Sequence, residues 1–332
     1  MLRYTLRRLT WLPIILFLVS ILTFAMLRVL PHQDPAIRIA GQGATEEQLD
    51  EIRADLGLDK PVFPVSFTSS PPFVRVNEDD QYTQWLGEVI NGDFGTSYVS
   101  REPIRETFID RFPLSFELVF LSVAISSVLG IGFGILSAVF RNRTPDYGVR
   151  GFAVVGASIP EFFLLTLLIV IPSYLWRYSM PVGGDVGLLE DPQRNLRLIL
   201  PAAIVLGVTG AAPLMRLVRT SMLEVLRSDY VRTARAKGLN RSTVIVAHAL
   251  RNAGTPILTA LGTAFIALFS GAIIAEQVLS IRGTGLWFYE STLAADLPVI
   301  QFLAIYTAAI VIIVNLIVDL SYAWADPRIR YS

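Results

Sequence analysis

The sequence predicts an all-α integral membrane protein whose core is six membrane-spanning helices. Hydrophobic residues make up 53% of its 332 residues and charged residues only 17%, a balance typical of a protein solvated mainly by lipid. The apolar residues also gather into runs of about 20, the length at which a helix crosses a hydrocarbon layer about 30 Å thick. A buried core helix would explain one such run, but not six in a chain of 36.7 kDa.

Six segments of the chain carry these apolar runs. The first resembles a secretory signal because Arg3, Arg7 and Arg8 precede it, but it is too long and no small-x-small cleavage site follows before Arg28. We therefore expect it to be retained as the first spanning helix. The predicted spans are 9–27, 118–140, 151–176, 198–215, 252–275 and 297–318, and the only charge within them is Glu161.

The distribution of arginines predicts that both termini lie in the cytoplasm. Arginines gather in the segments that six spans leave on one side, at residues 1–8, 141–150, 216–251 and 328–330. The short loops on the other side carry more acids than arginines, so the positive-inside rule gives one consistent topology. The chain then divides into 1–30 (N-terminus and first span), 31–113 (an extracytoplasmic insertion) and 114–332 (the other five spans).

The extracytoplasmic insertion is expected to contain short helices. Thr45 and Gln48 form a capping box before an amphipathic run, and Gly57 supplies a stop for that helix. Two further helices are predicted, at 82–90 before Asn91-Gly92 and at 103–112, whereas 61–80 lacks periodicity and predicts an exposed loop.

The loop after the fourth span predicts a short helix that lies beneath the membrane. The Ser-Asp pair at 228–229 is suited to the N-cap of a helix over 230–237, and Gly238 suits a left-handed position at its end. Asn240 or Ser242 would then cap a new helix that runs into the fifth span.

One face of this short helix is suited to contact with another protein. Tyr230 and Ala234 are four residues apart and share a face, and the small Ala234 and Gly238 permit close approach. Arg232 and Arg235 project elsewhere. Two other interpretations stay open: the loop is basic only because it obeys the topology rule, or it lies on anionic lipid.

The segment DYVRTARAKGLNRSTVIVAHALRNAGTPI, residues 229–257, resembles the EAA loop of permease subunits of bacterial ABC importers. It is most similar to the B-type subunit of dipeptide, oligopeptide and nickel systems. The resemblance covers nearly the whole chain, because several further motifs follow in the order of that family: MLRYTLRRLTWLPIILFLVSILTFAMLRVLP, LGLDKP, WLGEVINGDFGTSY, RFPLSFEL and VNLIVDLSYAWADPRIRY.

The sequence departs from the general family pattern in places. Arg232 and Thr233 stand where Glu and Ala are usual, and Leu250-Arg251 replaces Leu-Pro, although the TARAKG form is familiar from peptide permeases. Toward the outer face, SIRGTG at 280–285 replaces a Leu-Pro-Gly-type turn, and 64–80 resembles an insertion.

The resemblance implies a type I ABC importer permease fold in the bacterial inner membrane. Loop 220–255 would carry a coupling helix seated in a cytoplasmic ATPase, with contacts at Tyr230, Arg232, Ala234, Arg235, Lys237 and Gly238. The expected partners are a homologous second permease subunit, two ABC ATPase subunits, an extracytoplasmic substrate-binding protein and membrane lipid. The expected cargo is a di- or oligopeptide, with nickel and glutathione as alternatives.

The chain lacks the residues that ATP hydrolysis needs. No G-x-x-x-x-G-K-[ST] motif occurs and the only lysines are Lys60 and Lys237, so ATP and Mg²⁺ are expected on the partner ATPase subunits. There is no cysteine, and His32 and His248 are too few for a histidine-built metal site. We therefore expect no metal, no cofactor, no catalytic centre and no nucleic-acid partner.

Three glycines in the second span, Gly130, Gly132 and Gly134, superficially resemble a nucleotide-binding loop. They lie inside an apolar run, however, and their small-xxx-small spacing favours close packing of helices.

Glu161 and Glu276 are candidates for lining a translocation pathway. A charge at membrane depth costs roughly 2.5–3.5 kcal/mol and usually faces a cavity or a partner. A contact with the other permease half or an interfacial position would explain both acids equally well. Pro160 and Pro172 are expected to kink the third span and free carbonyl groups there. Paired membrane acids also occur in ion-coupled secondary carriers, which are the alternative of another class, although no internal repeat is evident.

Overall fold

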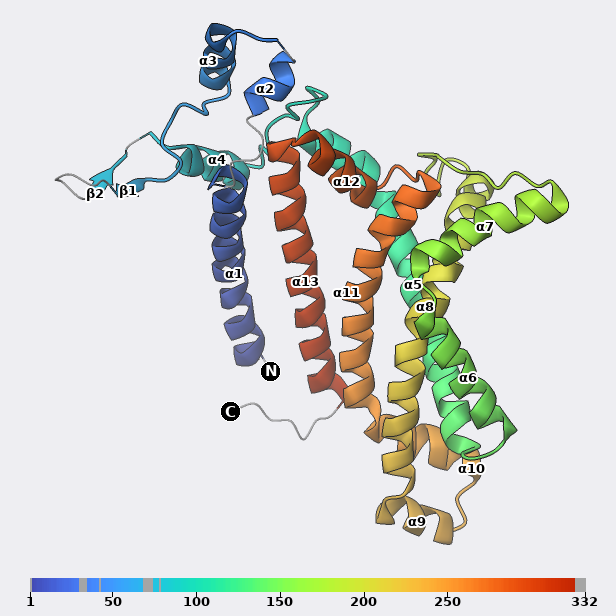
Figure 1. Cartoon of the computed structure of the whole chain (residues 1–332). Coiled ribbons are helices and arrows are strands. Elements are labelled where there is room, and N and C mark those ends of the chain that lie inside the picture. The colour runs from blue at the N-terminus through green and yellow to red at the C-terminus, as the bar shows by residue number, and fades with distance from the viewer. Residues whose placement is uncertain (1, 30–34, 42, 68–73, 78, 326–332) are drawn as a thin grey trace. The chain divides into compact units, whose positions relative to one another are not determined.

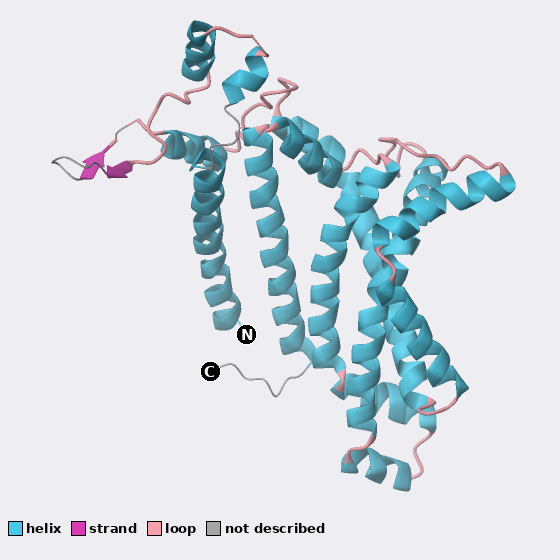
Figure 2. Cartoon of the chain, viewed as in Figure 1, coloured by secondary structure: helices cyan, strands magenta, loops and turns pink. Residues whose placement is uncertain are grey.

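The computed structural model describes residues 2–29, 35–41, 43–67, 74–77 and 79–325, and most of this length is helical (Figure 1, Figure 2). Packing divides the chain into two compact units. The first is built on Arg111–Leu286, and the second on Leu9–Asp110 with Trp287–Ile310.

The first unit contains most of the long apolar helices and the loop that carries the predicted coupling helix. Its elements are α5 (Ile104–Val139, whose first turns belong to the second unit), α6 (Thr144–Ser158), α7 (Glu161–Trp176), α8 (Pro192–Leu226), α9 (Asp229–Ala236), α10 (Arg241–Thr243), the π-helix η1 (Val244–Leu250) and α11 (Gly254–Leu279).

Within the described residues, four helices are long and apolar enough to cross a membrane: α5, α8, α11 and α13 (Leu297–Ala325). Helices α6 and α7 together would make a fifth span, although they are bent by 94°. The first predicted span falls in α1 (Leu2–Val29), whose fully described part, Thr10–Met26, is apolar. The all-α membrane fold is thus confirmed, and the count of six spans stays a prediction.

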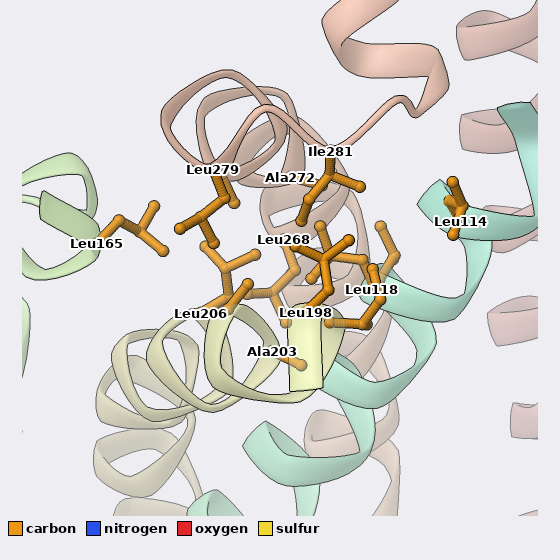
Figure 3. Close-up of a cluster of buried hydrophobic side chains, with 14 residues drawn as sticks. Leu114, Leu118, Leu165, Leu198, Ala203, Leu206, Leu268, Ala272, Leu279 and Ile281 are labelled. Carbon is orange, nitrogen blue, oxygen red and sulfur yellow. The ribbon is translucent and has the colours of Figure 1, made fainter. Parts of the chain in front are cut away.

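Helix α8 lies at the centre of the first unit. In its apolar part 61% of the residues are buried, against 28–33% in the other three long helices. It packs against α6, α7 and α11. A large buried cluster of leucine, isoleucine and alanine side chains joins α8 to α5, α7 and α11 (Figure 3). Because α9 follows directly after the end of α8, the predicted coupling loop is attached to the most deeply packed helix of the chain (Figure 1).

Two glycines of α5 let this helix approach α8 closely. A Cβ on Gly130 would come within 2.6 Å of the Leu214 side chain, and a Cβ on Gly134 within 2.6 Å of Val218. Gly132 faces open space, because a residue two positions away lies on the opposite side of a helix. The predicted close packing is therefore confirmed for Gly130 and Gly134 and wrong for Gly132.

The third predicted span is broken rather than kinked. Helices α6 and α7 are separated by Ile159 and Pro160, and their axes meet at 94°. Ile159 is extended, with φ −95° and ψ 123°, because the ring of a following proline disfavours helical backbone. The second predicted kink does not break the chain in this way, since Pro172 lies inside α7 and the helix continues beyond it.

The second unit carries the insertion between the first two predicted spans. Its elements are most of α1, then α2 (Pro35–Ala40), α3 (Glu46–Asp55), β1 (Val65–Phe67), β2 (Val74–Val76) and α4 (Gln81–Ile90), with most of α12 (Thr284–Ala294) and the first half of α13. The capping box is confirmed, because the Thr45 hydroxyl accepts from the Gln48 N–H and the Gln48 side chain accepts from the Thr45 N–H. The predicted helix at 82–90 is confirmed as α4, which the Asp80 side chain caps.

Two predictions for the insertion are wrong. Residues 61–80 contain a short antiparallel hairpin, β1–β2, in which Val65 lies opposite Val76. Strands of three residues are too short to show an alternating pattern in the sequence. The predicted helix at 103–112 is the beginning of α5, from Ile104, rather than a separate helix, because α5 continues beyond Pro113.

An aromatic cluster fixes α4 against α1 inside the second unit. The rings of Phe24, Phe63, Tyr82 and Trp85 lie with their centroids 5.3–5.9 Å apart. The Tyr82 hydroxyl, which is buried, also shares a hydrogen bond of 2.8 Å with the Ser20 hydroxyl of α1. The amphipathic α4 is thus held along the side of the first apolar helix.

Candidate functional site

The short helix predicted at 230–237 is present as α9. Its N-cap is Ser228, which has extended backbone with φ −67° and ψ 152°, and its C-cap is Lys237. The helix ends in a Schellman motif: the N–H of Gly238 donates to the carbonyl of Arg235, and the N–H of Leu239 donates to the carbonyl of Ala234. The boundaries predicted from the Ser-Asp pair and from Gly238 agree with this helix.

Gly238 is required by backbone conformation rather than by space. Its φ is +80°, in the left-handed region that side chains with a Cβ rarely adopt. A Cβ at this position would have no neighbour within 4 Å. Any other residue here therefore strains the end of α9 without a clash inside the subunit.

The inner face of α9 is anchored to the rest of the chain. Val231 is 0% exposed and Ala234 7% exposed, and both pack against Val244 of η1. Val225 and Leu226, at the end of α8, complete this cluster. Helix α9 is therefore supported from one side by α8 and by the segment that leads into α11.

Most other side chains of α9 are exposed. Tyr230 is 44% exposed, and Arg232, Arg235, Lys237 and Gly238 are exposed as well. Among these residues Arg232 pairs loosely with Asp229, at 3.4 Å and largely in solvent. The sequence predicts that Ala234 is open to a partner, but its side chain is buried. It packs instead with Val244 and with the end of α8.

The chain returns from α9 to the next long helix through an irregular helical turn. The Asn240 side chain, rather than that of Ser242, caps α10 by accepting from the N–H of Thr243 at 2.7 Å. The π-helix η1 follows directly, and the chain stays helical through Arg251, the position where the family usually has proline. π-helices are rare in proteins, and those that occur often lie at functional sites.

Glu161 lies where three helices meet. It begins α7 directly after the break at Pro160, and its Oε1 accepts from the Thr209 hydroxyl of α8 at 3.3 Å. Gly271 of α11 is so close that a Cβ there would come within 2.7 Å of Glu161 Oε2. The Glu161 side chain is half-buried, so part of it stays accessible.

Glu276 is enclosed within its own subunit. Its side chain is 0% exposed, accepts from the Ser115 hydroxyl at 2.6 Å and accepts from the Leu286 N–H at 2.8 Å. The Ser115 oxygen in turn accepts from the N–H of Thr284 at 2.7 Å. Glu276 therefore connects the turn at 280–285 to α5. Its side chain has no exposed surface that could line a pathway.

Sequence reasoning missed an ion pair at the opposite end of the first unit. Asp146 of α6 is 0% exposed and accepts from the Arg219 guanidinium of α8 at 2.8 and 2.9 Å. The Ser137 hydroxyl and the Asn142 N–H donate to the same carboxylate. An acid in the first turn after an arginine-rich loop was the available signal, but nothing local marks Arg219 as its partner.

The described residues contain no group of three or more histidine, aspartate or glutamate side chains that could hold a metal ion. The site consists of an exposed basic helix, α9, which packs against the end of α8 and against η1, and of one half-buried carboxylate, Glu161, at the break between α6 and α7.

The fold matches that of a solved ABC transporter. The inward-facing methionine transporter MetNI aligns with a TM-score of 0.54, at 19% identity, over 68% of this chain and 99% of that chain. A likeness at this identity shows the fold alone, which this chain shares with a chain of that ABC transporter.

The chain belongs to the family of inner membrane components of binding-protein-dependent transport systems. The sequence pattern of this family matches residues 130–331. The N-terminal part of such membrane components matches residues 1–119. Three curated relatives cover almost the whole chain: a putative peptide transport system permease of Brucella abortus (strain 2308; 36% identical, 96% of both chains), the dipeptide transport system permease DppB of Escherichia coli (strain K12; 37%, 100% of both) and the glutathione transport system permease GsiC of Escherichia coli O1:K1 (36%, 100% of both). The predicted resemblance to importer permeases is confirmed.

Proposed function

We propose that this chain is one of two homologous permease subunits of an ATP-driven importer, and that it forms half of the translocation pathway for di- or oligopeptides. The family supports the transport class, and the relatives supply the cargo: two of the three are peptide permeases. Glutathione is itself a small peptide, so the third relative supports the same chemical class. The chain lies in the bacterial inner membrane with both termini in the cytoplasm, and it performs no catalysis itself.

The observation that carries the proposal is the way α9 is mounted. One face is buried through Val231 and Ala234 against the end of α8 and the start of η1. The exposed surface of α9 is formed by Tyr230, Arg232, Arg235 and the turn at Lys237-Gly238. A partner that moves α9 therefore moves two long helices with it.

In the proposed mechanism the motor lies outside this chain. ATP and Mg²⁺ bind to two cytoplasmic ATPase subunits, and their closure displaces α9. An extracytoplasmic binding protein delivers the peptide to the opposite side. Glu161 faces the pathway at the break between α6 and α7, where a half-buried carboxylate suits the amino group of a peptide. Glu276 holds the outer turn at 280–285 in place.

The test uses the complete importer in proteoliposomes and the change Gly238→Trp. The new side chain strains the Schellman turn and projects from the surface that receives the ATPase. ATP-dependent dipeptide uptake and the ATPase activity stimulated by the binding protein should both fall to background. Gly92→Trp is the matched control, because Gly92 has φ +81° and equally open surroundings but lies in the insertion.

Uptake that survives Gly238→Trp contradicts the role of α9 in coupling. A second outcome separates the alternative class: purified chain that accumulates peptide on an ion gradient, with no ATPase present, contradicts the importer and establishes a secondary carrier.

A further inference from the structure

A pocket of about 490 Å³ lies beside α9, where α5 and α8 end. Its walls come from the last residues of α5, the last turn of α8, α9, the loop after α9 and the first residues of η1. All of these segments belong to the first compact unit, so the pocket is formed within a single body.

Four arginines line this pocket: Arg141, Arg227, Arg235 and Arg241. No acidic residue is among the residues that line it. Within the described part of the chain, none of the four forms a salt bridge, and Arg241 donates only to the carbonyl of Val139, at 3.2 Å. Carbonyl groups at the ends of α5 and α8 offset part of this charge. The pocket nevertheless keeps a positive charge that the chain itself does not balance.

The remaining lining is apolar. Side chains such as Leu223, Leu226 and Ile245 form it, and no hydroxyl or amide side chain is present. A free phosphate would use the guanidinium groups but leave the leucine and isoleucine part of the lining without a partner. A lining that is basic in one part and hydrocarbon in the other fits an amphiphile instead.

We propose that this pocket binds an anionic phospholipid, with the phosphate among the arginines and the first methylene groups of the chains against the leucines. The inference rests on the proposed function for its orientation, which puts the ends of α5 and α8 at the cytoplasmic surface, where phospholipid headgroups lie. Basic pockets between spanning helices on that side are suited to acidic headgroups. The lipid lies beside α9, so it occupies the space between the coupling helix and the ends of two spanning helices.

The test measures lipid binding to the full-length chain in detergent by native mass spectrometry. The probes are phosphatidylglycerol, phosphatidylcholine and inorganic phosphate. The variant Arg141→Gln/Arg227→Gln removes two charges from the pocket and leaves the residues of α9 intact. Arg143→Gln/Arg150→Gln removes two charges from the same loop and α6, outside the pocket. We expect phosphatidylglycerol to bind in preference to phosphatidylcholine, the pocket variant to bind it roughly thirtyfold more weakly and the control to bind as wild type.

Three results would overturn the proposal. Equal loss in both variants would show that the lipid responds only to overall charge. Displacement of phosphatidylglycerol by inorganic phosphate would show that the pocket recognises the free anion. Unchanged lipid binding in the pocket variant would show that these arginines do not hold the lipid. Because binding is measured without ATPase or transport, failure of the lipid site leaves the Gly238 test untouched.

Discussion

Glu276 of α11 accepts a hydrogen bond from the hydroxyl of Ser115 in α5, across 161 positions of sequence and in a fully buried setting. The second oxygen of the carboxylate accepts from the N–H of Leu286 at the start of α12. An acid in an apolar helix is usually considered first as part of a pathway. Here the hydrogen bonds of Glu276 to Ser115 and Leu286 indicate a structural role.

Replacement of Glu276 by alanine should therefore destabilise the protein. The change leaves buried donors at Ser115 and Leu286 unsatisfied, at a cost of about 1–3 kcal/mol for each. Glu276→Gln should cost less, because its carbonyl still accepts from Leu286 and its amide can donate to Ser115. Thermal unfolding in detergent measures both variants, with Glu190→Ala, in an exposed loop, as the control. A variant with normal stability and no uptake would contradict the structural role and support a role of Glu276 in the translocation pathway.

The ion pair of Asp146 and Arg219 should respond asymmetrically to removal of either partner. Asp146 is 0% exposed, whereas the Arg219 side chain keeps 21% of its surface exposed. Arg219→Met leaves a buried unpaired carboxylate and should cost about 3–5 kcal/mol. Asp146→Asn should cost less, since the freed guanidinium reaches water. Denaturant unfolding of both single variants and the double variant measures the coupling, and equal costs would contradict the burial seen here.

The two glycines Gly134 and Gly132 make a matched pair for testing the contact of α5 with α8. A Cβ at Gly134 would come within 2.6 Å of Val218, so Gly134→Ala should destabilise by about 1–3 kcal/mol. Gly132→Ala meets nothing within 4 Å and should be neutral or stabilising by up to about 1 kcal/mol, because alanine favours the helix. Thermal unfolding distinguishes the two. Similar effects would mean that the helices do not touch at Gly134.

The two faces of α9 should separate assembly from stability. Tyr230→Ala removes an exposed ring from the proposed ATPase contact, so co-purification of the ATPase should fall while the melting temperature holds. Val231→Ala removes part of a fully buried side chain and should lower the free energy of unfolding by about 1–2 kcal/mol. A Tyr230 variant that assembles normally would argue against this face as the dock.

Much of the fold follows from the sequence because its strongest signals are local. Apolar runs mark the long helices, and Ser228 with Gly238 marks both ends of α9, since caps and left-handed glycines act within a few residues. The burial of Ala234 could not be predicted in this way. Which side of a short helix faces inward depends on how Val244 and Leu226 pack against it, and the spacing of residues within α9 does not give that packing.

The same limit applies to the acids. Glu161 and Glu276 look alike in sequence, each a lone carboxylate in an apolar helix. Their environments differ because Ser115 and the turn at 280–285 enclose one of them, while the break at Pro160 leaves the other partly open. A break of 94° was also beyond prediction, since proline indicates where a helix is disturbed but not by how much.

The contacts of α9 determine which helices move when a partner displaces it. Helix α8 and the segment from η1 into α11 are joined next to α9 and again farther along, where Val218 and Met222 pack with Ala249 and Ile257. These two segments pack against each other along their length, so we expect them to move together. Helices α6 and α7 are joined only by Ile159 and Pro160 and meet there at 94°, so a change in the angle between them would require rotation of the backbone at these two residues.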